Sequence, residues 1–109
     1  MASFTAKQSD AVFKAIADPT RRRIMGLLRT GRPTIGEIAE NFRTSRPAIS
    51  KHIRQLRRAG LIVVRKRGTS RVCELNAKPL RAVDHWIQDY EAFWNTQLGN
   101  LKRFVEGKE

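Results

Sequence analysis

The stretch from Thr34 to Arg71 limits the possible folds more than any other part of the chain, because it joins strong helix signals to a strand pattern. Its first signal is the spacing of Thr34 and Glu37, three residues apart. At that spacing each side chain can satisfy a free backbone amide at the start of a helix. This pattern predicts a short helix over about residues 35–41.

A second helix is predicted over residues 46–59, and both of its ends carry signals. Thr44 or Ser45 can cap its start, and Pro47 suits a first turn, where an amide has no partner in any case. Gly60 can adopt the left-handed conformation that ends a helix. The apolar residues of this segment recur at helical spacing and its cations lie on the other side: Ile49, Ile53 and Leu56 against Lys51, Arg54 and Arg58. Residues 34–59 therefore predict a helix-turn-helix, the form that enters a DNA major groove.

Positive charge is concentrated around this unit. The chain of 109 residues carries 22 Lys and Arg against 10 Asp and Glu, a net charge of +12. Residues 41–75 contain ten of the basic residues and one acidic residue, which gives +9, whereas residues 76–109 contain five of each. A surface that is merely solvated mixes its signs, so this imbalance indicates electrostatic binding to a polyanion.

Residues 61–75 change from helical to strand periodicity and predict a two-stranded hairpin, or wing. We expect strands over 61–65 and 71–75, joined by a glycine-containing turn over 66–70. An isolated hairpin is marginal in water, so this one should lean on the helices through Leu61, Val63 and Leu75. Cys73 is interpreted as an inward packing residue rather than a redox sensor, a point the sequence leaves open.

Two further helices are predicted before the helix-turn-helix, over about residues 5–17 and 19–29. Asp18 and Pro19 separate them, because the residue before proline leaves helical geometry while Asp caps the next helix. Arg21, Arg22 and Arg23 surround the start of the second helix, where cations oppose the helix dipole. A phosphate contact by one of the three would rationalise that position.

The last segment predicts a long helix over residues 79–106, with Asn76 as a candidate cap. Its apolar residues follow a nearly heptad seam: Leu80, Val83, Ile87, Tyr90, Trp94, Leu98, Leu101 and Val105. Such a seam needs another helix, and we expect the N-terminal helix and the same helix of a second subunit. Trp86, Phe93 and Phe104 widen the seam. A small-molecule pocket lined by Trp86, Phe93 and Trp94 is a minor alternative.

Composition excludes several other classes of protein. The length fits one domain, residues 1–109, and a single cysteine excludes an internal disulfide framework. There is no signal-peptide pattern and no apolar run of membrane-spanning length, so we expect a cytoplasmic, nucleoid-associated protein. Neither a glycine-rich phosphate loop nor a cluster of acid-base residues is present, so no enzyme and no cofactor are expected.

Residues 10–106 resemble the ArsR/SmtB family of bacterial winged helix-turn-helix repressors. The resemblance rests on DPTRR, the helix pair, RPAISKH, LRRAGL and the basic wing, which occur in the family's order and spacing. It implies a mainly α fold of about five helices with a two-stranded wing, forming a homodimer through the terminal helices. It further implies a repressor that binds a palindromic operator and is released by a signal.

The expected DNA contacts combine the positions carried over from the family with residues whose chemistry suits DNA. They are Thr44, Ser45, Arg46, Pro47, Ser50, Lys51 and Arg54 in the turn and second helix, and Lys66, Arg67, Thr69 and Arg71 in the wing. Arg46 has the forked donors that read guanine, and the other cations release counterions from phosphates. We expect helix 46–59 in the major groove and wing 66–71 on the flanking backbone or minor groove.

The chain departs from the metal-sensing members of this family. Many of them carry a Cys-x-Cys pair on the first helix of the helix-turn-helix, and residues 35–41 contain no cysteine. Others bind metal between paired terminal helices, where this chain offers only Asp84, His85 and Asp89, a poor set for tetrahedral zinc. We therefore expect no metal site, leave the inducer unknown and interpret His52 as a packing or phosphate-contact residue.

A nonspecific nucleoid or RNA-binding protein is the alternative function, since net charge alone would serve it. The marked helix ends and the polarity of helix 46–59 favour sequence-specific duplex binding. The operator, the target genes and the choice between repression and activation do not follow from the residues.

Overall fold

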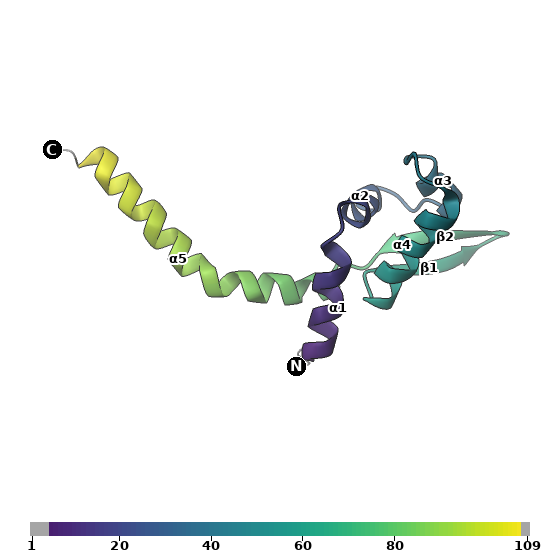
Figure 1. Cartoon of the computed structure of the whole chain (residues 1–109), viewed down its shortest axis with the longest axis horizontal. Coiled ribbons are helices and arrows are strands. Elements are labelled where there is room, and N and C mark those ends of the chain that lie inside the picture. Colours follow the sequence, from purple (N-terminus) through teal and green to yellow (C-terminus); the bar gives the residue numbers. More distant parts are fainter. Residues whose placement is uncertain (1–4, 108–109) are drawn as a thin grey trace.

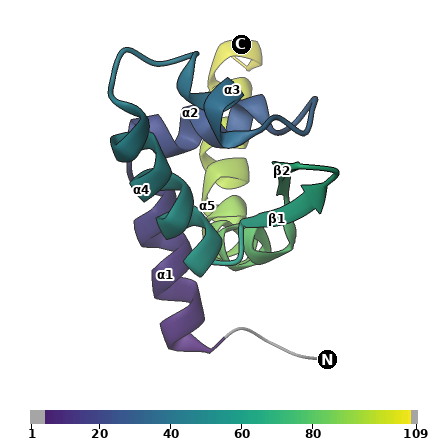
Figure 2. The same cartoon turned by 90° about the vertical axis from the view of Figure 1, so that its right-hand side faces the viewer.

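The computed structural model describes residues 5–107, which form five α-helices, one short 3₁₀ helix and one two-stranded sheet. The elements are α1 (Ala6–Ile16), α2 (Pro19–Leu27), α3 (Ile35–Ala39), α4 (Arg46–Arg58), β1 (Ile62–Arg67), β2 (Ser70–Leu75), the 3₁₀ helix η1 (Lys78–Leu80) and α5 (Arg81–Glu106). Figure 1 shows α1 to α4 and the hairpin gathered into one body, from which α5 projects as an arm. In Figure 2, the hairpin lies to the right of α4, and the end of α4 leads into β1.

The capping signals predicted for the helix-turn-helix are confirmed. The Thr34 hydroxyl accepts from the Glu37 amide at 3.1 Å, and the Glu37 carboxylate accepts from the Thr34 amide at 2.9 Å. Ser45, rather than Thr44, caps α4 by accepting from the Ala48 amide at 3.3 Å. Gly60 follows α4 with a φ of +81°.

All five α-helices are shorter than predicted. α1 begins one residue later and ends one residue earlier, α2 ends two residues earlier, and α5 begins two residues later, after η1. α3 ends at Ala39, two residues before the predicted end, and α4 ends at Arg58, one residue before it. After α3 the Asn41 amide donates to the Ile38 carbonyl, an i to i−3 bond that tightens the last turn into 3₁₀ geometry. Such frayed ends leave no sharp signal in the sequence.

The core lies where α2, α3 and α4 meet the start of the hairpin. Ile24, Ile38, Ile49, Leu56 and Leu61 are fully buried there, and Ile53 is 2% exposed. The predicted stripe of α4 therefore faces inward, which turns the basic side of the helix to solvent.

The hairpin turn is shorter than predicted and the strands are longer. Arg67 pairs with Ser70, so the loop consists of Gly68 and Thr69 alone, and the predicted turn over 66–70 is wrong. Gly68 has a φ of +62°, which the first loop position of a type II′ turn requires. That turn matches the twist of the strands and so lets pairing continue to the tip.

The predicted phase of the first strand is wrong at one residue. Ile62 is buried and Val64 packs against the core, whereas Val63 points to the other face and lies outside the core. Successive strand residues alternate between the two faces of the hairpin, so a prediction displaced by one residue exchanges the inward and the outward side chains. Leu61, Leu75 and Cys73 do pack inward as predicted.

The wing is tied to the start of the helix-turn-helix. The Cys73 amide donates to the Pro33 carbonyl at 2.8 Å, and Thr34 forms an isolated β-bridge with Val72. These bonds fix the wing relative to α3.

The terminal helix begins with a 3₁₀ turn, and Asn76 does not cap α5. Instead the Asn76 side chain donates to the Gly60 carbonyl at 2.9 Å and accepts from the Lys78 amide at 3.4 Å, which ties η1 to the end of α4. The 26 residues of α5 extend about 39 Å. The molecule measures 68 × 34 × 22 Å, and no helix between residues 5 and 107 is both long and apolar enough to cross a membrane.

Candidate nucleic-acid interface

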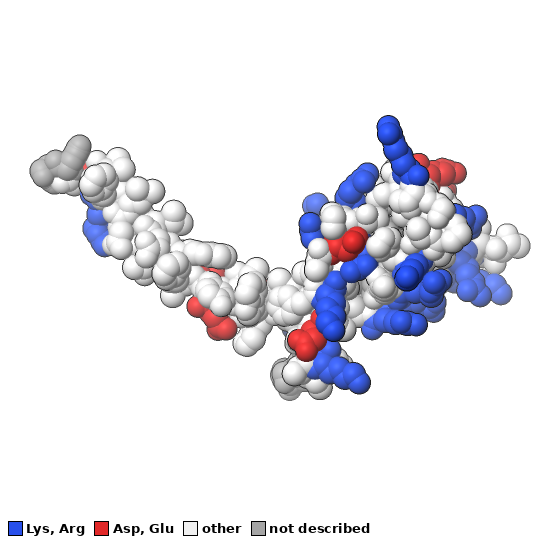
Figure 3. Space-filling view, in the orientation of Figure 1, with Lys and Arg blue, Asp and Glu red and all other residues white. Residues whose placement is uncertain are grey.

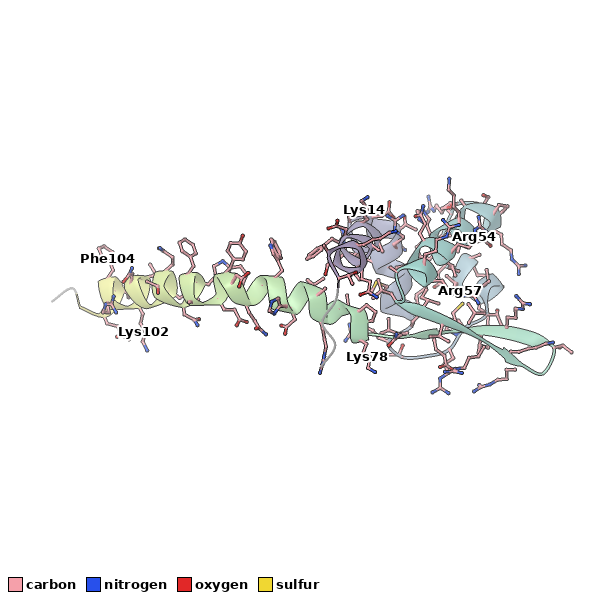
Figure 4. The ribbon with its side chains drawn as sticks, turned by 90° about the horizontal axis from the view of Figure 1, so that it is seen from below. Lys14, Arg54, Arg57, Lys78, Lys102 and Phe104 are labelled. Atoms are coloured by element: carbon pink, nitrogen blue, oxygen red, sulfur yellow. The ribbon has the colours of Figure 1, made fainter. Side chains whose placement is uncertain are left out.

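The outer face of α4 is polar and cationic. Arg46, Lys51 and Arg54 are exposed, on the side opposite the buried Ile49, Ile53 and Leu56. Figure 3 shows Lys and Arg side chains gathered over the body, whereas the arm carries few charges of either sign on the same face. Figure 4 shows Arg54 and Arg57 on the body, at the end of the molecule away from the tip of α5.

The predicted contact residues occupy two neighbouring surfaces. At the start of α4, Thr44, Ser45, Arg46 and Pro47 are exposed, as are Lys51 and Arg54, while Ser50 is half-buried; at the wing tip, Lys66, Arg67, Thr69 and Arg71 are exposed. A side chain that contacts a duplex must be accessible, and ten of these eleven are exposed.

The start of α4 and the wing meet at one hollow. A space of about 500 Å³ is lined by Arg46, by Thr69, Ser70 and Arg71 of the wing, and by residues 34–36 at the start of α3. The Arg46 guanidinium lies over Gly36, so that a Cβ at Gly36 would be 3.6 Å from the Arg46 Cζ. The sequence analysis considered α4 and the wing separately and did not predict that both line one hollow.

The cations of this surface keep their charge free for a partner. Glu74 lies at the base of the wing, where it pairs with Arg65 at 3.0 Å and with Arg32 at 3.6 Å. Among residues 5–107 no carboxylate lies within 4.0 Å of Arg46, Lys51 or Arg54, or of the basic wing tip. The field around the hollow is therefore positive.

The three arginines at the start of α2 have partners within the protein. The Arg21 Nε donates to the Ala15 carbonyl at 2.7 Å and Arg22 donates to the Ile16 carbonyl at 2.8 Å, so both satisfy groups at the end of α1. The Arg23 guanidinium lies 4.6 Å from the centre of the Phe42 ring. These contacts account for cations at a helix start without a phosphate. In the sequence, the Asp18-Pro19 pair marks a sharp turn from the end of α1 to the start of α2. This turn is the feature from which the contacts of Arg21 and Arg22 with the end of α1 could have been predicted.

The pKa values of two titratable groups near these elements differ from their usual values. The backbone amide of Arg21 donates to Asp18 at 3.0 Å and, helped by the positive charge of the Arg21 side chain, lowers the pKa of that carboxyl below its usual value. Burial raises the pKa of the Cys73 thiol, and Arg57 opposes the rise only in part. A buried thiol that keeps its proton is a poor nucleophile, which supports the packing role.

The candidate metal-ligating residues lie on two elements, β2 and α5. α3 contains no cysteine, and Cys73 is buried in β2. Asp84, His85 and Asp89 are exposed on α5, and the Asp84 carboxylate accepts from Gln88 at 3.0 Å. Within the described part of the chain no three His, Cys, Asp or Glu side chains come together as a ligand group.

The seam of α5 is largely uncovered. Tyr90, Trp94, Leu98, Leu101 and Val105 are exposed, Val83 and Ile87 are half-buried, and Leu80 packs against the core of its own body. Trp86, Phe93 and Phe104 are exposed as well, up to 78% for Phe104. In Figure 4, Phe104 and Lys102 point to opposite sides of α5.

A helix pair whose second helix is basic outside, followed by a basic antiparallel hairpin, defines the winged helix-turn-helix class of DNA-binding proteins. The family model described as "Helix-turn-helix domain" matches residues 16–65. The transcriptional repressor SdpR of Bacillus subtilis is 42% identical over 72% of this chain and 88% of its own length. The HTH-type transcriptional regulator Rv2034 of Mycobacterium tuberculosis is 34% identical over 95% of this chain and 94% of its own length.

Solved structures agree with these relatives. One of them is a crystal structure of an ArsR family transcriptional regulator, whose sequence is 36% identical to this chain. The match covers 87% of this chain and 97% of that protein, with a TM-score of 0.74. A winged helix-turn-helix domain from Mycobacterium bovis, described as homodimeric, shares the fold with a TM-score of 0.64 at 24% identity, over 84% of this chain and 94% of its own. The chain belongs to the ArsR family of helix-turn-helix transcriptional regulators, and it is a DNA-binding regulator rather than an enzyme.

Proposed function

We propose that this regulator is a homodimeric repressor that binds a palindromic operator in the cytoplasm. α4 enters the major groove with Arg46 reading a guanine, and the wing tip lies on the flanking backbone or minor groove. The observation that carries the proposal is the pairing of an exposed basic face of α4 with a basic wing around one hollow that is lined by no acidic residue. Repression is the activity in the printed name of SdpR.

The surface of α5 supports the dimer. The chain exposes 8246 Å², whereas a compact folded monomer of its mass exposes about 6,200 Å². Its radius of gyration is 18.7 Å, against about 13 Å for a compact domain of roughly 100 residues. An arm with an exposed aromatic and aliphatic face is unfavourable in water, so a second copy covers it. The Mycobacterium bovis domain, described as homodimeric, shares this fold.

Selection of bound duplexes from a random pool tests this function. The expected result is a palindrome whose half-sites are about one helical turn, roughly 34–36 Å, apart, because two recognition helices related by a twofold axis face the same side of the duplex. The alternative, nonspecific binding to nucleoid DNA or RNA, predicts no enriched sequence. Equal affinity for all duplexes at physiological salt, measured by gel shift with competitor DNA, would remove the repressor proposal.

We further infer that the release signal does not act through a family-type metal site. α3 lacks the cysteine pair, and the carboxylate-rich set on α5 suits zinc poorly. Elemental analysis of the purified dimer is expected to find no stoichiometric zinc. One zinc per subunit that is lost on replacing His85 would contradict this inference.

A further inference from the structure

We propose that Arg21 is a positioning residue that sets the angle of α4 against α1, and thereby the half-site spacing that the dimer accepts. The inference rests on the proposed function, because spacing has meaning only for a dimer on a palindrome. It concerns a residue outside the DNA-contacting surface.

The Arg21 side chain joins three helices. Its Nε donates to the Ala15 carbonyl at 2.7 Å and its Nη2 donates to the Lys14 carbonyl at 3.0 Å, both at the end of α1. Its Nη1 donates to the Gln55 side-chain oxygen and lies 3.2 Å from the His52 Nδ1, both on α4. One N–H on Nε, two on Nη1 and one on Nη2 are thus engaged, four of the five that a guanidinium carries.

The base of this side chain is also fixed. Asp18 caps α2 by accepting from the Arg21 amide, and the Asp18 carboxylate lies 4.0 Å from the His52 ring. Because a guanidinium only donates, the His52 Nδ1 must act as the acceptor, which places the ring proton on Nε2. Arg21 therefore sits between fixed partners on both sides, and few other rotamers keep all of these bonds.

The contacts of α1 connect this network to the dimer arm. Phe13 of α1 packs edge-on against Trp86 of α5, with ring centres 5.7 Å apart, and Trp86 packs in turn against Tyr90 at 5.3 Å. α1 thus contacts the arm that would carry the partner subunit in the proposed dimer. Arg21 lies on the route from that arm to α4.

Apolar packing alone would restrict the angle of α4 only loosely, because helix crossing angles of one packing class scatter by about 15–20°. Ile49, Ile53 and Leu56 hold the helix against the core, but dispersion contacts and burial depend weakly on direction. Hydrogen bonds weaken steeply when their angle changes, so bonds to His52 and Gln55 resist rotation of α4. Inserting one base pair turns a half-site by about 35° and moves it by about 3.4 Å, so a rigid dimer should reject it.

The test compares binding of the full chain to the selected palindrome and to versions with one base pair added or removed between the half-sites. Arg21→Ala and Gln55→Ala are expected to flatten the affinity ratio between native and altered spacing by at least about threefold, the equivalent of one modest hydrogen bond. Arg21→Lys should restore the ratio only in part, since an ammonium cannot reach both helices. Arg22→Ala is the matched control, because Arg22 bonds the end of α1 but not α4.

A purely structural role for Arg21 would give a different result. Thermal unfolding identifies any loss of stability, which lowers affinity for every spacing by the same factor. Unchanged spacing ratios in Arg21→Ala and Gln55→Ala would therefore overturn the proposal.

A second measurement needs no DNA. Spin labels on cysteines at positions 7 in α1 and 54 in α4 report the distance between these helices, and the buried Cys73 does not compete for the label. The distance distribution should broaden in Arg21→Ala and stay narrow in Arg22→Ala. A wild-type protein without palindrome preference would refute the proposed function alone, and the label distances would then decide the positioning role.

Discussion

At the scale of single residues, Asp18 links the end of one helix to the start of the next through a charged cap. Its carboxylate accepts from the Arg21 amide and lies near the His52 ring, which lowers the pKa of Asp18 below its usual value of 3.8. In the unfolded chain these partners are absent. The carboxylate therefore stabilises the folded state whenever it is ionised.

The stabilisation by Asp18 should depend on pH. Because the pKa of Asp18 is lower in the folded state, its contribution is complete above the unfolded value of 3.8 and is lost as the pH falls through the folded value. Asp18→Ala is expected to lower the free energy of unfolding by about 1 kcal/mol at neutral pH. Urea unfolding at neutral and acidic pH measures the difference, which should shrink in acid. An equal difference at both would contradict the assignment.

A second residue-scale prediction separates base reading from phosphate binding. Arg46 stands in the first turn of α4, whereas Lys66 stands on the wing. Arg46→Ala should lose base preference at one operator position, about 1–3 kcal/mol of discrimination. Lys66→Ala should weaken binding to all duplexes alike and reduce the salt dependence. Gel shifts on operators substituted at each position measure both effects. Identical specificity profiles for the two variants would contradict the roles proposed for them.

At the scale of elements, the junction between α4 and the wing depends on one glycine. Gly60 has a φ of +81°, where a side chain is strained, and its carbonyl accepts from Asn76. This bond links the end of α4 to the segment before η1, and a Cβ at Gly60 would lie 3.4 Å from the Pro79 Cγ.

Replacing Gly60 by alanine should therefore be costly. Gly60→Ala is expected to lower the free energy of unfolding by about 1–2 kcal/mol, the cost of a left-handed residue with a Cβ. Gly26→Ala is the control: Gly26 lies in α2, and a Cβ at this position would meet nothing within 4 Å, so alanine should stabilise by about 0.5–1 kcal/mol. Denaturant unfolding of both variants gives the comparison. Equal effects of the two substitutions would mean that backbone strain does not govern the junction.

At the scale of the whole molecule, the apolar face of the arm, α5, is left uncovered in a single subunit. The body packs its core from α2, α3, α4 and the hairpin, yet the outer half of α5 contacts nothing within the described part of the chain. Two arms packed together would bury the seam and hold two α4 helices at a fixed separation.

Charge placed on the seam should separate the subunits. Leu98, which is 63% exposed, would be buried in the proposed dimer, so Leu98→Glu should yield monomers and abolish operator binding, because an unpaired buried charge is strongly unfavourable. Asn95→Glu adds the same charge on the polar side of α5 and should leave the dimer intact. Sedimentation of both variants measures their mass. A Leu98→Glu protein that still sediments as a dimer would move the interface elsewhere.

The sequence by itself determined where the helices lie, the caps of the helix-turn-helix and the position of the charge, because these depend on neighbours within a few residues. Thr34 with Glu37, Ser45 with the Ala48 amide, and Gly60 after α4 act locally. The exposed basic face of α4 follows from helical spacing alone. The family also follows, since its motifs occur in order along the chain.

Only the tertiary structure decided how distant segments meet. The partners of Arg21 lie six and seven residues earlier and more than thirty residues later, so no local pattern reveals them. The meeting of Arg46 with the wing over Gly36, and the strand phase that puts Ile62 rather than Val63 inside, depend in the same way on packing. Hydrogen bonds and close packing depend on how near two groups lie in space. For residues far apart in the chain, the order of the sequence does not give that spatial distance directly.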